Sequence, residues 1–194
     1  MKRSLFVFTL AAAMLVAAPL AQATVIHLRA DLSGLNKIPP NASPGTGFGI
    51  FTLDTAAQTL AIHIDFSGLT APNTAAHIHC CLASPGVNSN QPVATTTPTF
   101  AGFPAGVSGV YDTVLDLTDP ASYRAGFITS HGGIATAEAD LIFGLQNQET
   151  YLNIHSGNFP GGEIRGILVP EPGTLTLLAL GLCAGVASLR RKRA

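Results

Sequence analysis

The sequence predicts a mainly β protein: an antiparallel β-sandwich with one short helix, flanked by a signal peptide and a C-terminal transmembrane helix. Two observations favour the β class. Short segments in which apolar and polar residues alternate recur from residue 26 onward, and clusters rich in Pro, Gly, Ser and Asn separate them. The regular alternation of strands and helices that indicates a parallel sheet is not seen, so we expect antiparallel pairing.

The N-terminus has the three parts of a secretory signal peptide. Lys2 and Arg3 precede the apolar run SLFVFTLAAAMLVAAPL, which leads to the small-residue motif Ala21-Gln22-Ala23. This order predicts cleavage after Ala23, so that residues 1–23 are the signal peptide and the rest is exported through the inner membrane. A retained N-terminal membrane anchor is the alternative, and the small-residue motif argues against it.

The C-terminus carries a second membrane-related segment. Residues 173–189 are uncharged and mostly apolar, and at about 1.5 Å per residue they reach roughly 25 Å, near the lower limit for a spanning helix. Pro170, Glu171 and Pro172 precede this predicted transmembrane helix. A basic cluster that would hold the tail on the cytoplasmic side follows it. The cluster consists of Arg190, Arg191, Lys192 and Arg193.

This ordered set of Pro-Glu-Pro, apolar helix and basic cluster resembles the PEP-CTERM sorting signal of Gram-negative bacteria, over residues 169–194. The resemblance implies that an exosortase, a membrane-embedded cysteine transpeptidase, recognises the tail and cleaves near Pro-Glu-Pro. It also implies a link to biofilm and exopolysaccharide-producing cells. The chain would lie in the inner membrane before cleavage and in the cell envelope, at the surface or outside the cell afterwards. A permanent C-terminal anchor is the alternative.

The segment between the two signals, residues 24–169, is long enough for one domain with a buried core. It contains four basic and ten acidic residues. Such a domain lacks the positive surface that binds nucleic acid, so we expect no nucleic-acid partner. It also lacks a P-loop, a dinucleotide fingerprint, a nucleophile elbow and a zinc-protease helix, and we therefore expect that the protein is not an enzyme.

Strand patterns follow one another along this domain. Residues 26–32 alternate between apolar and polar side chains, and the Pro-rich segment IPPNASPGTG interrupts them. Residues 48–54 and 59–68 then flank a hairpin turn at residues 55–58. Further strands are expected in AAHIHCCL, GVYDTVLDLTD, TYLNIH and GEIRGILV.

One helix interrupts the strands between residues 120 and 146. Ile134, Glu138, Leu141 and Leu145 recur at helical spacing, and Gly133 precedes the first of them. We therefore expect a single short helix that starts near Gly133.

Two stretches of the domain resemble the CHRD family, which is named for chordin. YLNIHSGNFPGGEIRGIL resembles the C-terminal hallmark of the family, and AAHIHCCLASPG resembles its His-x-His strand and the small-residue loop after it. The resemblance extends over about residues 26–169. It implies an immunoglobulin-like β-sandwich and carries over no established enzymatic activity. The family commonly has Gly or another small residue after His-x-His, whereas this chain has Cys80 and Cys81.

His77 and His79 are the first candidates for metal ligands. Residues i and i+2 of a strand share a face, so both imidazoles would point one way and Ile78 the other. Such a pair can chelate Cu or Zn. His155, in the strand before the hallmark hairpin, and Cys81 are the further candidate ligands. The alternative interpretation is that these histidines hydrogen-bond to backbone groups and acidic neighbours inside the sandwich.

Cys80 and Cys81 are the only cysteines of the mature domain, because Cys183 lies in the predicted tail helix. The Cα atoms of adjacent residues are about 3.8 Å apart, below the usual lower bound of about 4.4 Å for a disulfide. We therefore expect two buried free thiols, with a disulfide between neighbours as the alternative. In a regular strand Cys81 would share the face of the two histidines.

Glu163 and Arg165 lie two residues apart in the last predicted strand. We interpret them as a cross-strand ion pair that holds the hairpin. A general base at Glu163 is the alternative, but no nucleophile or second carboxylate is near it in the sequence.

These features predict an exported CHRD-domain protein that is processed by an exosortase. The function that the sequence favours is a binding or structural module of the cell surface or biofilm matrix, with a protein or polysaccharide partner. The alternative is a metal-binding redox or metal-handling protein that holds Cu or Zn on the His-x-His strand.

Overall fold

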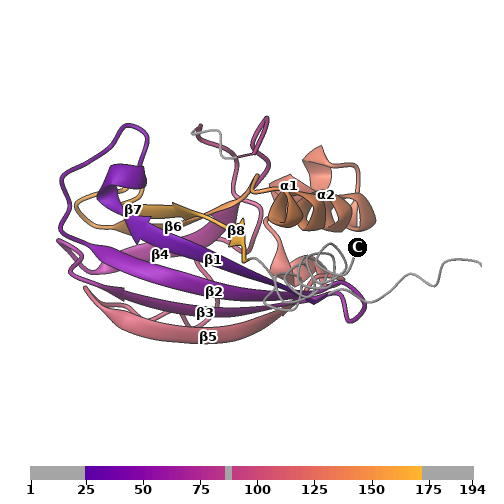
Figure 1. Cartoon of the computed structure of the whole chain (residues 1–194), viewed down its shortest axis with the longest axis horizontal. Coiled ribbons are helices and arrows are strands. Elements are labelled where there is room, and N and C mark those ends of the chain that lie inside the picture. Colours follow the sequence, from indigo (N-terminus) through magenta and orange to yellow (C-terminus); the bar gives the residue numbers. More distant parts are fainter. Residues whose placement is uncertain (1–24, 86–88, 172–194) are drawn as a thin grey trace, which may run out of the picture.

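The computed structural model describes residues 25–85 and 89–171. Alternation of apolar and polar residues produces long strands, and two helices lie together at one end of them (Figure 1). The strands are β1 (Val25–Ser33), β2 (Thr46–Asp54), β3 (Thr59–Ser67), β4 (Asn73–His79), β5 (Gly109–Asp116), β6 (Tyr151–Ser156), β7 (Ile164–Ile167) and β8 (Val169–Pro170). The α-helices are α1 (Ala125–Ser130) and α2 (Ile134–Gln146), and two short 3-10 turns span Gly34–Asn36 and Pro120–Ser122.

All the strand pairs are antiparallel, which confirms the mainly β prediction. The strands hydrogen-bond in the order β4-β6-β7-β1-β2-β3-β5, and β8 pairs with β1 beside this path. Ile78 of β4 and Tyr111 of β5, at the two ends of that order, belong to one buried cluster, so the sheet curls around its core. The described strands thus form one curled sheet. The division into two sheets of an immunoglobulin-like sandwich stays a prediction.

The core contains the inward face of each long strand. In β3, Leu60, Ile62, Ile64 and Phe66 are all buried, as their spacing predicts, and His63 between them lies on the outer face. The predicted hairpin is also confirmed, because β2 and β3 pair over nine residues on each side of the turn at residues 55–58.

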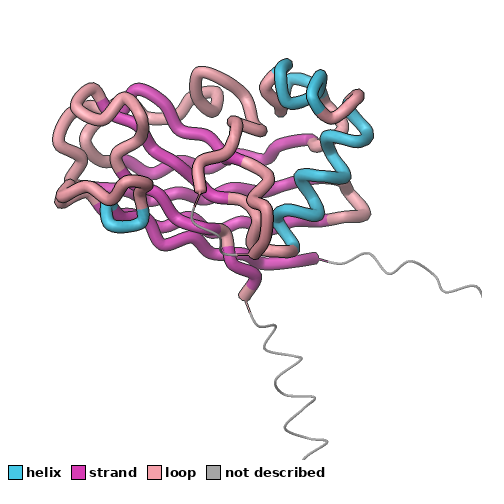
Figure 2. Tube along the Cα trace, turned by 90° about the horizontal axis from the view of Figure 1, so that it is seen from above, coloured by secondary structure: helices cyan, strands magenta, loops and turns pink. Residues whose placement is uncertain are grey.

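The helical region contains two α-helices, so the prediction of a single short helix was wrong in number. α2 begins after Gly133, as expected, and buries Ala137, Leu141 and Leu145 against the core. α1 was missed because its six residues are too few to show a helical period, and Phe127 is its one buried side chain. Figure 2, seen from above, shows both helices at the same end of the strands.

The predicted signal peptide, the predicted transmembrane helix at residues 173–189 and the basic cluster lie outside the described residues. Within residues 25–85 and 89–171 no helix has the length and hydropathy needed to cross a membrane. The sorting motif is described as far as Glu171. Pro170 pairs with Leu28 in β1, and the Glu171 backbone N–H donates to the carbonyl of His27 over 2.8 Å.

Glu163 does not form the expected ion pair with Arg165, and that interpretation was wrong. Its side chain is fully buried, with one oxygen accepting from Ser43 Oγ at 2.6 Å and from the Thr70 backbone N–H at 2.7 Å, and the other accepting from Ser156 Oγ. Burial raises the pKa of this carboxyl, but the three hydrogen bonds outweigh it and hold the pKa below its ordinary value. Glu163 therefore connects the β6–β7 hairpin to two loops.

We predict that Glu163→Gln lowers the free energy of unfolding by about 1–3 kcal/mol, because it weakens buried hydrogen bonds to a charged acceptor. The folded-state pKa is lowered, so the ionised carboxylate stabilises the fold above the unfolded pKa of about 4.3, and this stabilisation is lost as the pH falls through the folded pKa. Urea denaturation at pH 7 and from pH 5 to 3 would measure both effects. Glu138→Gln, in a half-buried helix residue that contacts Gln58, is the control. Equal stability of the two variants would contradict the prediction.

Candidate metal site

The pairing of β4 with β6 brings the predicted histidines together. His79 lies opposite Tyr151, His77 opposite Asn153, and Ala75 opposite His155, so His155 is diagonal to His77. Ile78 is fully buried in the core. His77 and His79 therefore share the other face of β4, as predicted.

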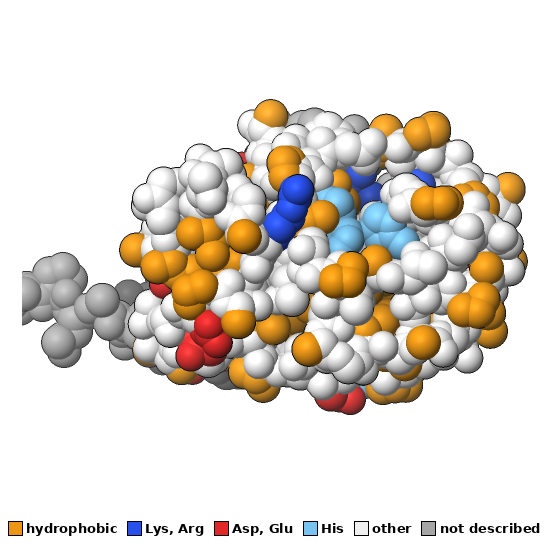
Figure 3. Space-filling model, turned by 180° about the vertical axis from the view of Figure 1, so that it is seen from behind, with side chains coloured by type: hydrophobic (Ala, Val, Ile, Leu, Met, Phe, Trp, Pro, Cys, Tyr) orange, Lys and Arg blue, Asp and Glu red, His pale blue; other side chains and the backbone are white. Residues whose placement is uncertain are grey.

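The three imidazoles form a compact cluster. The ring centroid of His77 is 4.8 Å from that of His79 and 4.7 Å from that of His155. One ring nitrogen from each residue lies within 4.8 Å of the other two. His77 and His79 are buried and His155 is half-buried. Figure 3 shows a face of the molecule on which His side chains gather in a hollow, with Lys and Arg side chains beside them.

Backbone carbonyls fix the orientation of two of the rings. His79 Nδ1 donates to the carbonyl of Gln91 at 2.6 Å, and His155 Nδ1 donates to that of Pro160 at 2.7 Å. In both rings Nε2 is consequently the unprotonated nitrogen. This arrangement, with one ring N–H held by a carbonyl, is the usual one in metal-binding histidines.

Two nitrogens of the cluster are buried without a hydrogen bond. His77 Nδ1 and His79 Nε2 have no partner among the described residues. A buried polar atom without a partner costs about 1–3 kcal/mol, and a water or an ion bound at the site is one explanation for such an atom in a native protein. An ion that accepts an electron pair would satisfy His79 Nε2, which is unprotonated, and it would satisfy His77 Nδ1 if that ring carries its proton on Nε2.

Burial keeps the imidazoles neutral. It lowers the pKa of His77 to about 3 and that of His79 to about 4, and the neighbouring positive charges act in the same direction. Burial also lowers the pKa of His155. The rings are therefore neutral at pH 7, each with one nitrogen free of a proton, which is the form that coordinates a metal.

Lys37 and Asn153 adjoin the cluster, and no pattern in the sequence pointed to either. Lys37 Nζ donates to Asn153 Oδ1 and to the carbonyl of Gly161, each at 2.9 Å. Asn153 Nδ2 in turn lies 2.9 Å from His155 Nε2, to which it donates. A chain of hydrogen bonds thus runs from the Lys37 ammonium to the third imidazole. Lys37 comes from the Pro-rich segment after β1, and no local pattern relates it to a residue 116 positions away.

Arg165 and Tyr151 support the other side of the cluster. The Tyr151 ring stacks on His79 with a centroid distance of 4.5 Å and an interplanar angle of 9°. The guanidinium carbon of Arg165 lies 3.5 Å from the centroid of the same ring. Arg165 is fully buried, and it donates to the carbonyl of Ser89 at 2.9 Å. Since β6 lies between β4 and β7, the tyrosine separates the guanidinium from the imidazole.

Cys81 is not available as a ligand, and the expectation of two free thiols was wrong. Cys80 and Cys81 form a disulfide with each other. The expectation assumed that the strand continues through both residues, whereas β4 ends at His79. Both sulfurs instead lie against α2, near the carbonyl of Asp140. The candidate donors are therefore imidazole nitrogens alone.

The three histidines fit a transition-metal ion. Imidazole suits Zn and Cu, and three histidines with one open position are a known zinc arrangement. Donors at about 2.0–2.1 Å from a tetrahedral ion lie about 3.3 Å apart, so nitrogens within 4.8 Å of one another need only a small inward movement of the rings. The movement would also separate His155 Nε2 from Asn153 if that nitrogen binds the ion.

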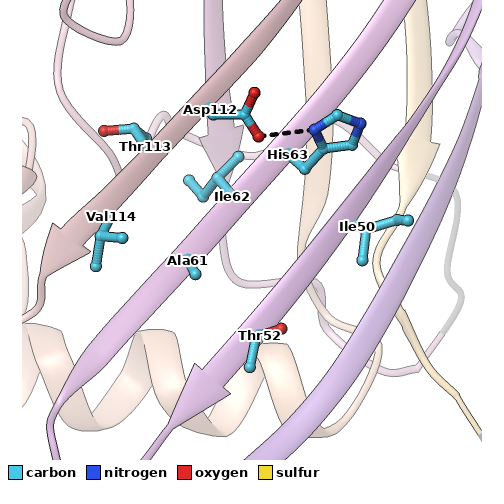
Figure 4. A pocket seen from close by; sticks show the side chains of 8 residues that line it. All are labelled: Ile50, Thr52, Ala61, Ile62, His63, Asp112, Thr113 and Val114. Atoms are coloured by element: carbon cyan, nitrogen blue, oxygen red, sulfur yellow. Dashed lines mark hydrogen bonds and ion pairs between the residues drawn. The ribbon is translucent and has the colours of Figure 1, made fainter.

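A second feature lies on the outer face of β2, β3 and β5. A shallow groove of about 410 Å³ runs along these strands, and His63 Nδ1 lies 2.8 Å from Asp112 Oδ1 within it (Figure 4). Both side chains are substantially exposed, so water screens their interaction. The groove is lined by Ile50, Thr52, Ala61, Ile62, His63, Asp112, Thr113 and Val114. One histidine and one carboxylate at the surface make a weaker metal candidate than the buried cluster.

The fold and the cluster define a curled antiparallel β domain with a buried three-histidine site on one face. The chain belongs to the CHRD family, because the CHRD domain model matches residues 28–168. The PEP-CTERM protein-sorting motif matches residues 168–193. Both resemblances are thereby confirmed, and together they indicate an exported protein of the cell envelope or surface that an exosortase processes. No curated protein and no solved structure matches the chain.

We predict that Gly144→Ala destabilises the fold by about 1–3 kcal/mol, because the added methyl group overpacks the helix against the disulfide. A Cβ at Gly144 would lie 2.8 Å from Cys80 Sγ, whereas one at Gly126 in α1 meets no atom closer than 3.7 Å. Gly126→Ala is therefore the control. Thermal denaturation would compare the variants, with Gly144→Ala repeated in a Cys80→Ala/Cys81→Ala chain, where its cost should decrease. An unchanged cost in that chain would show that the disulfide is not the cause.

Proposed function

We propose that the CHRD domain of this protein is a metal-binding module, and that His77, His79 and His155 hold one Cu or Zn ion outside the inner membrane. The observation that carries the proposal is the convergence of three neutral imidazoles, two of which have a buried nitrogen with no partner in the described structure. Imidazoles that only stabilise the sheet would be expected to use both nitrogens in hydrogen bonds. A metal ion accounts for the unused ones.

The donor set supports binding of an ion rather than redox chemistry of sulfur. Cys80 and Cys81 are joined to each other, so the chain supplies nitrogen ligands and no thiolate to this cluster. Nitrogen ligands suit Zn and Cu(II), which do not require a soft sulfur donor. We therefore propose a module that binds the ion through imidazole nitrogens, with no part for sulfur.

The sorting motif indicates where in the cell the domain would bind its metal ion. The sorting motif directs the chain to the envelope or surface, and we propose that the processed domain works there as a binding or structural module of the surface or biofilm matrix. Its partner would be a protein or a polysaccharide. The bound ion would then be the place where such a partner contacts the domain.

We expect the purified protein, produced without an affinity His-tag and exposed to Zn or Cu, to contain about one ion per chain by elemental analysis. His77→Ala/His79→Ala should lose the ion, because only one of the three ligands remains. His155→Ala should bind more weakly by at least tenfold, since removal of one ligand lowers the affinity. Circular dichroism would verify that each variant is folded.

The matched control is His27→Ala/His63→Ala. It also removes two histidines, but these lie on the outer face of the sheet, where they contact Thr52 and Asp112. It should bind as much metal as the unaltered protein. An unaltered protein that contains no ion under these conditions would refute the proposal.

We also expect that replacing Pro170, Glu171 and Pro172 by alanine leaves an unprocessed chain in the membrane fraction, because the exosortase would no longer recognise its motif. Immunoblots of membrane and extracellular fractions would measure the processed share. Val169→Ala, at an exposed neighbouring position, is the control and should be processed normally. Normal processing of the triple variant would contradict this assignment of the motif.

A further inference from the structure

Two cations lie beside the three histidines. Lys37 Nζ donates to Asn153 Oδ1, and Nδ2 of the same amide lies 2.9 Å from His155 Nε2. Arg165 lies over the Tyr151 ring, which in turn stacks on His79. Lys37 is 5% exposed and Arg165 is fully buried. Neither Lys37 nor Arg165 forms an ion pair with a carboxylate of the described residues. Within residues 25–85 and 89–171, no ion pair therefore compensates this positive charge.

Glu163, two residues from Arg165 in the sequence, does not supply a negative charge to Lys37 or Arg165. The Glu163 carboxylate accepts hydrogen bonds from Ser43, Thr70 and Ser156, and these groups occupy both of its oxygens. Among the described residues, the Arg165 guanidinium contacts the ring of Tyr151 and the neutral oxygens of Ser89 and Asn90. Glu163 and the cluster thus belong to separate hydrogen-bond networks.

A bound dication would make this imbalance larger. Three neutral imidazoles add no negative charge, and an uncompensated charge in a buried site is costly. Three protein ligands also leave a coordination position open on a tetrahedral ion. An anion in that position would satisfy both the coordination and the charge.

Donors for such an anion lie beside the cluster. Lys37 Nζ has three N–H groups, of which Asn153 Oδ1 and the Gly161 carbonyl take two. Asn153 Nδ2 donates to His155 Nε2, and it would lose this acceptor if that nitrogen bound a metal. One N–H of Lys37 and one of Asn153 would then be available.

We propose that the metal held by His77, His79 and His155 takes a carboxylate as its fourth ligand, with Lys37 and Asn153 donating to that carboxylate. This inference rests on the proposed metal site and deepens it. A carboxylate fits because it has two oxygens, so that one can bind the ion while the other accepts hydrogen bonds. The carboxylate can come from a small free acid or from a carboxylated polysaccharide.

The test uses the purified protein loaded with Co²⁺, whose visible spectrum reports changes in coordination, and acetate as the probe. We expect a saturable spectral change in the unaltered protein. Lys37→Gln should weaken acetate binding about tenfold, because it removes the charge next to the anion, while Lys37→Arg should largely retain it. Arg29→Gln removes an equal charge from a half-exposed residue paired with Asp31, and should have no effect.

Asn153→Asp tests the carboxylate ligand by placing a carboxylate of the protein itself beside the proposed metal ion. The new carboxylate has nearly the shape of the amide and sits where Lys37 already donates, so it should replace the external anion. We expect tighter Co²⁺ binding and no spectral response to acetate. This variant and the titration of the unaltered protein do not depend on whether Lys37→Gln folds.

The outcomes separate this inference from the proposed function. A protein that binds no Co²⁺ or other metal overturns both. A protein that binds Co²⁺ but gives no saturable response to acetate, or responds equally in Lys37→Gln and Arg29→Gln, keeps the metal site and overturns the carboxylate ligand. Polygalacturonate at matched carboxylate concentration distinguishes the source. If polygalacturonate changes the Co²⁺ spectrum as much as acetate or more, the ligand is a polymer. If acetate alone changes the spectrum, the ligand is a small acid.

Discussion

The pairing of β4 with β6 is the constraint on which the candidate site depends. Because side chains alternate between the faces of a strand, the register that places Ile78 and Ile154 in the core also places His77, His79 and His155 together on the other face. A slip of one residue would turn the imidazoles into the apolar core and the isoleucines toward the opposite, polar face. The apolar residues that stabilise the fold therefore also fix the positions of the metal-ligand candidates.

Burial has opposite consequences for the two kinds of basic group at this site. It keeps the imidazoles neutral and able to coordinate an ion, because the charged form of a buried ring is costly. It also places Lys37 and Arg165 where their charges cost free energy, and the fold offsets this with carbonyl oxygens, an amide and the face of Tyr151. The site thus combines neutral ligands with a positively charged surrounding, a setting that favours anions.

Export and the chemistry of the domain are consistent with each other. The sorting motif places the domain outside the inner membrane, and disulfides persist in such oxidising surroundings. The disulfide between Cys80 and Cys81 packs on α2 directly after the His-x-His pair. It removes the thiols from the candidate donors and fixes the end of β4 against the helix, so the histidines lie on a supported strand end.

The sequence by itself determined the antiparallel β class, the hairpin between β2 and β3, the start of α2, the family resemblance and the three histidines, because each depends on residues close together in the chain or on a local motif. Only the tertiary structure decided the rest. Lys37 meets Asn153, and Glu163 meets Ser43, through contacts across more than one hundred positions that no local period encodes. The disulfide between Cys80 and Cys81 also depends on tertiary structure, because β4 ends before these residues and α2 packs against their sulfurs.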